Sequence, residues 1–129
     1  MDTPTTVTAV DPFDLPDWLG TSEVTWRAID GVHAGHHVRG RLGGGPDSLE
    51  CDLLAADQAF PQPVLDDEWR RRVHQAWTYG QVLLLECDGR LTLAVPGTGF
   101  TADQVLESLG RLAKAVGASP GRYLAALRL

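Results

Sequence analysis

The residues best suited to chemistry in this sequence are three closely spaced histidines: His33, His36 and His37. Imidazole nitrogens bind zinc, which takes three or four protein ligands, so Cys51 or Asp52 on a following strand could complete a site. The spacing matches no standard ligand pattern, and histidines in an exposed glycine-containing loop are the alternative interpretation. We therefore predict no bound cofactor and keep the three histidines as a secondary metal-site hypothesis.

Two cysteines and a run of arginines are the other candidates for chemistry. Cys51 and Cys87 both fall on predicted strands, and could form a redox pair only if those strands lay side by side. The alternative is that both thiols are free and packed as small hydrophobic residues. The run 70–72 follows three acidic residues, which indicates a self-neutralised helix surface and not a phosphate site.

Length and charge limit the classes of function. The 129 residues fit one domain, which we place at residues 12–129, after a flexible N-terminal arm over residues 1–11. A net charge of −6 disfavours binding to nucleic acid. The sequence has neither a secretion signal nor an apolar run of membrane-spanning length, so we expect a cytoplasmic protein without membrane contacts.

The elements that would position these residues are organised around a β-hairpin over residues 81–100. Asp88-Gly89 favours positive φ at both turn positions, which is typical of a type I′ turn. This turn places Leu84 opposite Leu93 and Leu85 opposite Thr92. Both faces of the hairpin are then apolar, so each needs a covering layer, either a segment of this chain or another subunit.

Other elements follow from local patterns. Alternating residues predict strands over 24–29, 37–42 and 49–55. One helix should begin after Asp66 or Asp67 and end near Tyr79, and a second should begin after Thr101 and end at Gly117. The second helix should bury residues 105, 106, 109, 112, 113 and 116. Residues 13–20 could form a short helical turn that covers the second hairpin face, anchored by Phe13, Leu15, Trp18 and Leu19.

These elements predict an α+β fold: a five-stranded, mainly antiparallel sheet with helices packed on one face. The tail over residues 120–129 fits a short helix or a strand, and we favour the helix. The order of three strands, a helix, two strands and a helix resembles the type III secretion chaperone-like fold over about residues 12–117. That resemblance rests on topology alone, and implies a homodimer that binds other polypeptides without catalytic residues.

The leading functional prediction is a non-catalytic protein-interaction or chaperone/adaptor-like module that forms a homodimer. Trp69 and Trp77 are hard to bury together in a thin domain, and with Leu83 and Leu85 they form the predicted partner interface. The alternative is a small metal-dependent or ligand-binding enzyme that uses the histidine loop.

Overall fold

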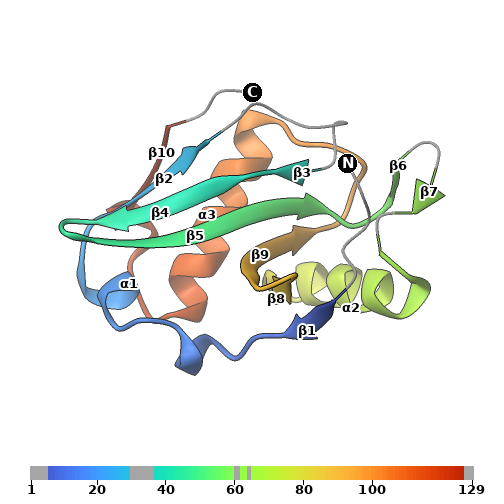
Figure 1. Cartoon of the computed structure of the whole chain (residues 1–129), viewed down its shortest axis with the longest axis horizontal. Helices are drawn as coiled ribbons and strands as arrows, with labels where there is room; N and C mark the ends of the chain where they lie inside the picture. Colours follow the sequence, from blue (N-terminus) through green and yellow to red (C-terminus); the bar gives the residue numbers. More distant parts are fainter. Residues whose placement is uncertain (1–5, 30–36, 60–61, 64, 127–129) are drawn as a thin grey trace.

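The computed structural model describes residues 6–29, 37–59, 62–63 and 65–126 (Figure 1). Within these residues, three α-helices pack against an open mixed sheet of eight strands, so the α+β class is confirmed. The strands of this sheet are β1 (Val7–Ala9), β2 (Val24–Ala28), β3 (His37–Val38), β4 (Gly40–Gly44), β5 (Asp47–Ala55), β8 (Leu83–Cys87), β9 (Arg90–Val95) and β10 (Tyr123–Ala126).

Besides these strands, the described residues form two long helices and several short elements. The helices are α1 (Trp18–Thr21), α2 (Asp67–Thr78) and α3 (Ala102–Ala115), and the 3₁₀ turns are η1 (Pro12–Asp14) and η2 (Pro120–Arg122). A separate two-stranded ribbon joins β6 (Gln58–Ala59) to β7 (Gln62–Pro63). None of the described helices is both long enough and apolar enough to span a membrane.

The sheet is larger and more mixed than the five-stranded antiparallel sheet that the sequence predicted. Its order is β1-β8-β9-β5-β4-β2-β10, and β3 also pairs with β5. The pairs β5–β9 and β2–β10 are parallel, whereas the other pairs in the sheet are antiparallel. The predicted strand over residues 37–42 is divided at Arg39 into β3 and β4, which share one register against β5.

The central hairpin is confirmed. Asp88 and Gly89 both have positive φ, 53° and 84°, as a type I′ turn requires. Leu84 pairs with Leu93 and Leu85 with Thr92, which is the predicted register. The turn chemistry is local, and this explains why the sequence alone was sufficient to predict it.

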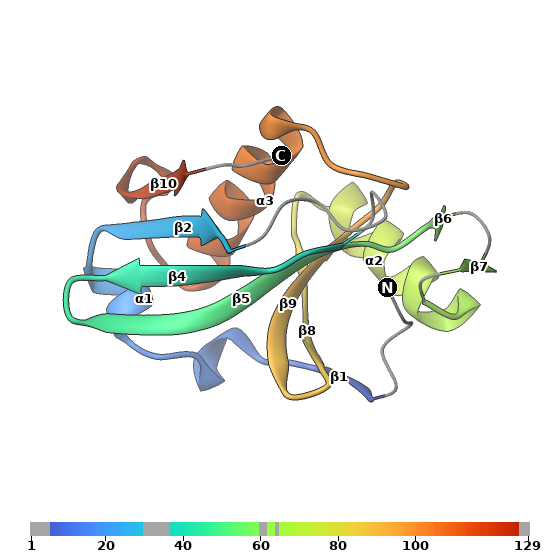
Figure 2. The same cartoon turned by 45° about the horizontal axis from the view of Figure 1, so that its top comes forward.

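The two faces of the hairpin belong to separate hydrophobic cores. Leu84 and Leu93 pack with α3, whereas Leu85 and Ala94 pack with Val73 of α2. Figure 2 shows α3 and α2 on either side of the β8–β9 hairpin. The prediction that the helices pack on one face was therefore wrong, because a single helical layer would have left the second apolar face in water.

Helix α2 supplies the second covering layer from the same chain. The predicted alternative cover, residues 13–20, packs elsewhere: Leu19 is fully buried in the core beneath α3, on the first face. Phe13, which was expected to be an anchor, is 95% exposed. The predicted helix caps are confirmed, since Asp66 accepts from the Trp69 N–H and Thr101 from the Gln104 N–H.

Three local predictions failed where tertiary contacts decided the conformation. Residues 7–9 of the predicted flexible arm form β1, which pairs with β8. The tail forms η2 and then β10 instead of a helix; Tyr123 is buried there, and its hydroxyl donates to the Leu19 carbonyl at 2.6 Å. Leu106, expected on the buried face of α3, is 48% exposed.

Candidate functional site

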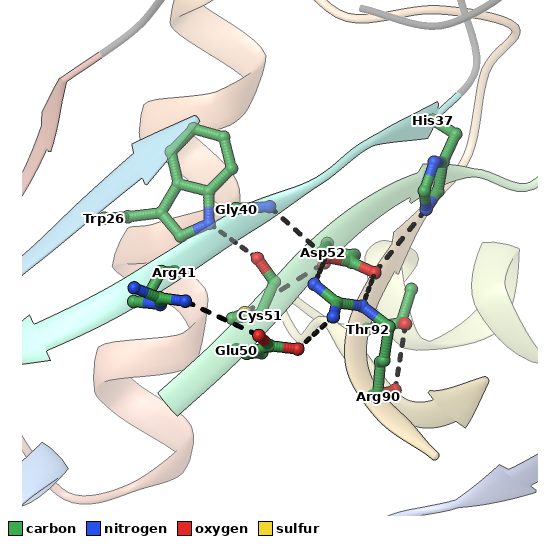
Figure 3. Close-up of polar contacts among 9 residues, drawn as sticks. All are labelled: Trp26, His37, Gly40, Arg41, Glu50, Cys51, Asp52, Arg90 and Thr92. Atoms are coloured by element: carbon green, nitrogen blue, oxygen red, sulfur yellow. Dashed lines mark hydrogen bonds and ion pairs between the residues drawn. The ribbon is translucent and has the colours of Figure 1, made fainter. Parts of the chain in front are cut away.

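The strongest polar cluster surrounds Asp52 on β5 (Figure 3). Arg90, at the start of β9, donates from Nε to Asp52 Oδ2 at 2.8 Å and from Nη2 to Oδ1 at 2.9 Å. The Gly40 N–H donates to Oδ1 at 3.2 Å. Both carboxylate oxygens of a residue that is only 2% exposed are therefore occupied.

Electrostatics keep Asp52 ionised. Burial by itself would raise the pKa of this carboxyl, but the hydrogen bonds from Arg90 and Gly40, together with the nearby His37 imidazole, outweigh burial and lower the pKa to about 2. The hydrogen bond to Asp52 also raises the pKa of Arg90. A carboxylate with so low a pKa and both oxygens engaged is a poor general base at neutral pH.

Towards the surface, the cluster continues through Glu50. Its carboxylate accepts from Arg90 and lies 3.5 Å from Nη2 of Arg41, and both Glu50 and Arg41 are about half exposed. The cluster therefore links β4, β5 and the start of β9. This arrangement is a structural ion-pair network. Removing one partner of the buried Asp52–Arg90 pair would destabilise the fold more than removing a partner of an exposed pair.

His37 is the one predicted metal ligand that lies within the described residues; His33 and His36 lie outside them. Its Nε2 is 3.6 Å from Asp52 Oδ2, while its Nδ1 is buried and lacks a hydrogen-bond partner. Among the described residues, no group of three or more His, Cys, Asp or Glu side chains could hold a metal ion. The three-histidine site stays a hypothesis about the loop.

The two cysteines cannot act as the redox pair considered from the sequence. Cys51 packs in the core beneath α3 and Cys87 in the core beneath α2, on opposite faces of the sheet. Both thiols are free and buried. Burial raises the pKa of each thiol, and the neighbouring Asp52 carboxylate adds to this effect at Cys51. Neither is therefore an activated nucleophile.

A second polar cluster lies at the carboxyl ends of the parallel strands β5 and β9. His74 Nε2 is 2.7 Å from Asp57 Oδ1, and Asp57 Oδ2 accepts from the Gly97 N–H at 2.9 Å. Arg70 and Arg71 line the same hollow of about 570 Å³. The Asp57 contacts tie α2 to the loop after β9, and the arginines interact with Asp67 of their own helix.

The predicted interface residues are largely used within the chain. Leu85 is fully buried in the core beneath α2, and Leu83 and Trp69 pack against that core. The Arg72 guanidinium lies 4.4 Å from the Trp69 ring centre. Trp77 packs against the other core, and the Arg111 guanidinium stacks 3.4 Å from its ring centre. Intrachain stacking of this kind covers both indole rings in part.

The two most exposed large apolar side chains of the described residues, Phe13 and Tyr79, lie near Pro12. Two hollows of about 620 and 670 Å³ share Pro12, Lys114 and Ala115 as lining residues, and we call them together the Pro12 groove. Phe13 lines one hollow and is 95% exposed; Tyr79 lines the other and is 71% exposed. Sequence reasoning did not predict the exposure of Phe13 or Tyr79, because only tertiary packing decides which aromatic residues of a chain stay in water.

Comparison of the chain with protein-family models, curated proteins and solved structures found no match. The resemblance to the secretion chaperone-like fold therefore stays a prediction from the order of elements.

Proposed function

We propose that this chain is a non-catalytic protein-binding module of the chaperone or adaptor kind, and that the Pro12 groove is its binding surface. The observation that carries this proposal is Phe13, a large apolar side chain that is 95% exposed beside a hollow. Exposed apolar residues bordering a concave surface are typical of protein-interaction sites, because leaving them in water is otherwise unfavourable.

The backbone around Phe13 is fixed by local hydrogen bonds. The Asp11 carboxylate accepts from the Phe13 N–H at 3.0 Å, and the Leu15 N–H donates to the Pro12 carbonyl at 3.2 Å. Proline further restricts the turn. A backbone that is already ordered loses little conformational entropy on binding, which favours affinity.

The composition of the groove is that of a protein interface. Tyr79 stands exposed in the first hollow, where Arg111 also contributes to the lining. Tyrosine and arginine are both enriched among the residues that contribute most to binding energy. The residues that line both hollows are Pro12, Lys114 and Ala115, two of them apolar.

The homodimer expected from the sequence is a second part of the proposal, and the β10 edge supports it. Within the described residues β10 pairs only with β2, so its other edge is open, and Leu124 on this strand is 61% exposed. An open strand edge can pair with the same strand of a second copy. We also propose a cytoplasmic setting, since two buried free thiols suit a reducing compartment.

Site-specific photo-crosslinking tests the proposed binding surface. A photoreactive benzoyl-phenylalanine replaces Phe13 in one variant and Glu86, an exposed residue of β8, in the control. Irradiation in extract of the source cells should give a discrete heavier adduct only from position 13. The same pattern at both positions, or uncrosslinked chain alone, would count against a binding surface at the groove.

A further inference from the structure

The first hollow of the Pro12 groove is bounded by an edge of β8 that β1 leaves uncovered. The Asp88 N–H donates to the Thr6 carbonyl, and the Val10 N–H donates to the Leu84 carbonyl at 2.9 Å. Beyond Val10 the chain turns away into η1, where proline occupies the first position. The strand pairing along this edge therefore stops at Leu84, while the hollow extends along residues 81–84.

Val82 is the next residue whose backbone faces this edge. Peptide groups alternate in direction along a strand, so residues 82, 84 and 88 point their N–H and C=O groups the same way. Within the described residues, neither the N–H nor the C=O of Val82 has a hydrogen-bond partner. Val82 lines the hollow and is 7% exposed.

The groove carries more basic side chains than acidic ones, in a chain that is acidic as a whole. The whole chain has a net charge of −6, yet the groove is lined by Arg111 and Lys114 against a single carboxylate, Asp17. Arg111 is occupied with Glu107 and with the carbonyls of Trp77 and Gln81. Lys114, the only lysine of the sequence, is exposed and has no acidic partner among the described residues.

We infer that the Pro12 groove binds an extended acidic peptide segment of a partner protein, which continues the path of β1 along β8. One residue of this segment exchanges two backbone hydrogen bonds with Val82. An apolar side chain of the segment rests on Tyr79 and Pro12, and a carboxylate pairs with Lys114. Addition of a strand to an open sheet edge is a common mode of peptide recognition, in which backbone bonds give affinity and side-chain pockets give specificity.

This inference rests on the proposed protein-binding function and adds the conformation and the charge of the partner. A library of nine-residue linear peptides, displayed and selected on the full chain, provides the probe. We expect the enriched peptides to combine Asp or Glu with alternating apolar residues. The best peptide is then resynthesised with each backbone nitrogen methylated in turn, because a methylated nitrogen cannot donate to Val82.

Pairing with Val82 predicts that methylation at one position, and not at its neighbours, weakens binding tenfold or more. The substitution Lys114→Glu should weaken binding to a similar extent, whereas Arg27→Glu, the same charge reversal at an exposed position outside the groove, should change it less than twofold. Selection that enriches no peptide, a uniform methylation profile, or equal effects of the two charge reversals would overturn the inference. A crosslink from position 13 together with a uniform profile would leave the binding function standing and remove only the strand pairing.

Discussion

At the residue scale, Asp52 shows how much of this molecule depends on contacts that are remote in sequence. Its two strongest hydrogen bonds come from Arg90, 38 positions away. Sequence reasoning considered Asp52 only as an additional metal ligand, and no local pattern could have indicated Arg90 as its partner. The parallel pairing of β5 with β9, which brings them together, was itself not predictable from the spacing of these residues.

The Asp52–Arg90 pair predicts a specific dependence of stability on pH. The folded pKa of Asp52 is about 2 against an ordinary value of 3.8, so the pair stabilises the folded state above about pH 4 and is lost as the pH falls towards 2. We expect Asp52→Asn to lower the free energy of unfolding by about 3 kcal/mol at pH 7. Between pH 5 and pH 2 that difference should shrink by about 2 kcal/mol.

Denaturant unfolding of the wild type and of Asp52→Asn at several pH values measures this difference. Glu86→Gln is the matched control, because Glu86 is exposed and should give a change below about 0.5 kcal/mol at every pH. A cost of Asp52→Asn that is the same at pH 7 and pH 2 would contradict the assignment of a depressed pKa.

At the element scale, the parts that could be predicted are those whose signals lie within a few residues. The Asp88-Gly89 turn, the Asp66 and Thr101 caps and the glycine ends of both long helices all act locally, and all are confirmed. The local failures include β1 and β10. Residues 124–126 are good helix formers, yet the buried Tyr123 and the pairing with β2 impose a strand.

Helix α3 allows a matched test of the first core. Leu109 is 2% exposed and packs beneath the sheet, while Leu106 on the same helix is 48% exposed. Leu109→Ala should therefore lower the free energy of unfolding by about 2–5 kcal/mol, and Leu106→Ala by less than about 1 kcal/mol. Chemical denaturation measures both, and similar costs for the two variants would show that the orientation of the helix is wrong.

A second test concerns the contact between β2 and β4. The Trp26 indole lies against Gly40 and donates from Nε1 to the Cys51 carbonyl at 2.8 Å; a Cβ at Gly40 would lie 2.4 Å from the ring. Gly40→Ala should lower the free energy of unfolding by about 1–3 kcal/mol or more. Gly43→Ala in the same strand is the control, since the nearest atom to its Cβ would be 3.9 Å away. Thermal unfolding in which both variants melt alike would contradict this packing.

At the scale of the whole molecule, both faces of the hairpin are covered within one chain, and Trp69 and Trp77 are partly buried against the two cores; the predicted tryptophan interface stays a prediction. Helix α2 covers the second face, and the apolar side chains that stay in water include Phe13, Tyr79 and Leu124. Charge patterning gave no indication of the groove, because Pro12, Tyr79 and Lys114 are brought together only by the fold.

Native mass spectrometry tests the proposed homodimer. We expect the mass of two chains for the wild type, and the mass of one chain for Leu124→Glu, which places charge on the open β10 edge. Leu106→Glu is the control, because it adds the same charge at an exposed position of α3 and should stay dimeric. A wild-type protein that remains a single chain at micromolar concentration would contradict the dimer.

The central claim, that the Pro12 groove binds a partner, is tested most directly by mapping the backbone amide signals of the full chain in an NMR titration with the peptide selected from the library. We expect the largest shifts at Val10, Gly80, Val82 and Ala115, which line the groove, and small shifts at Asp57 and His74 in the other hollow. Shifts concentrated at the Asp57–His74 hollow or along β10, with the groove unchanged, would contradict the claim.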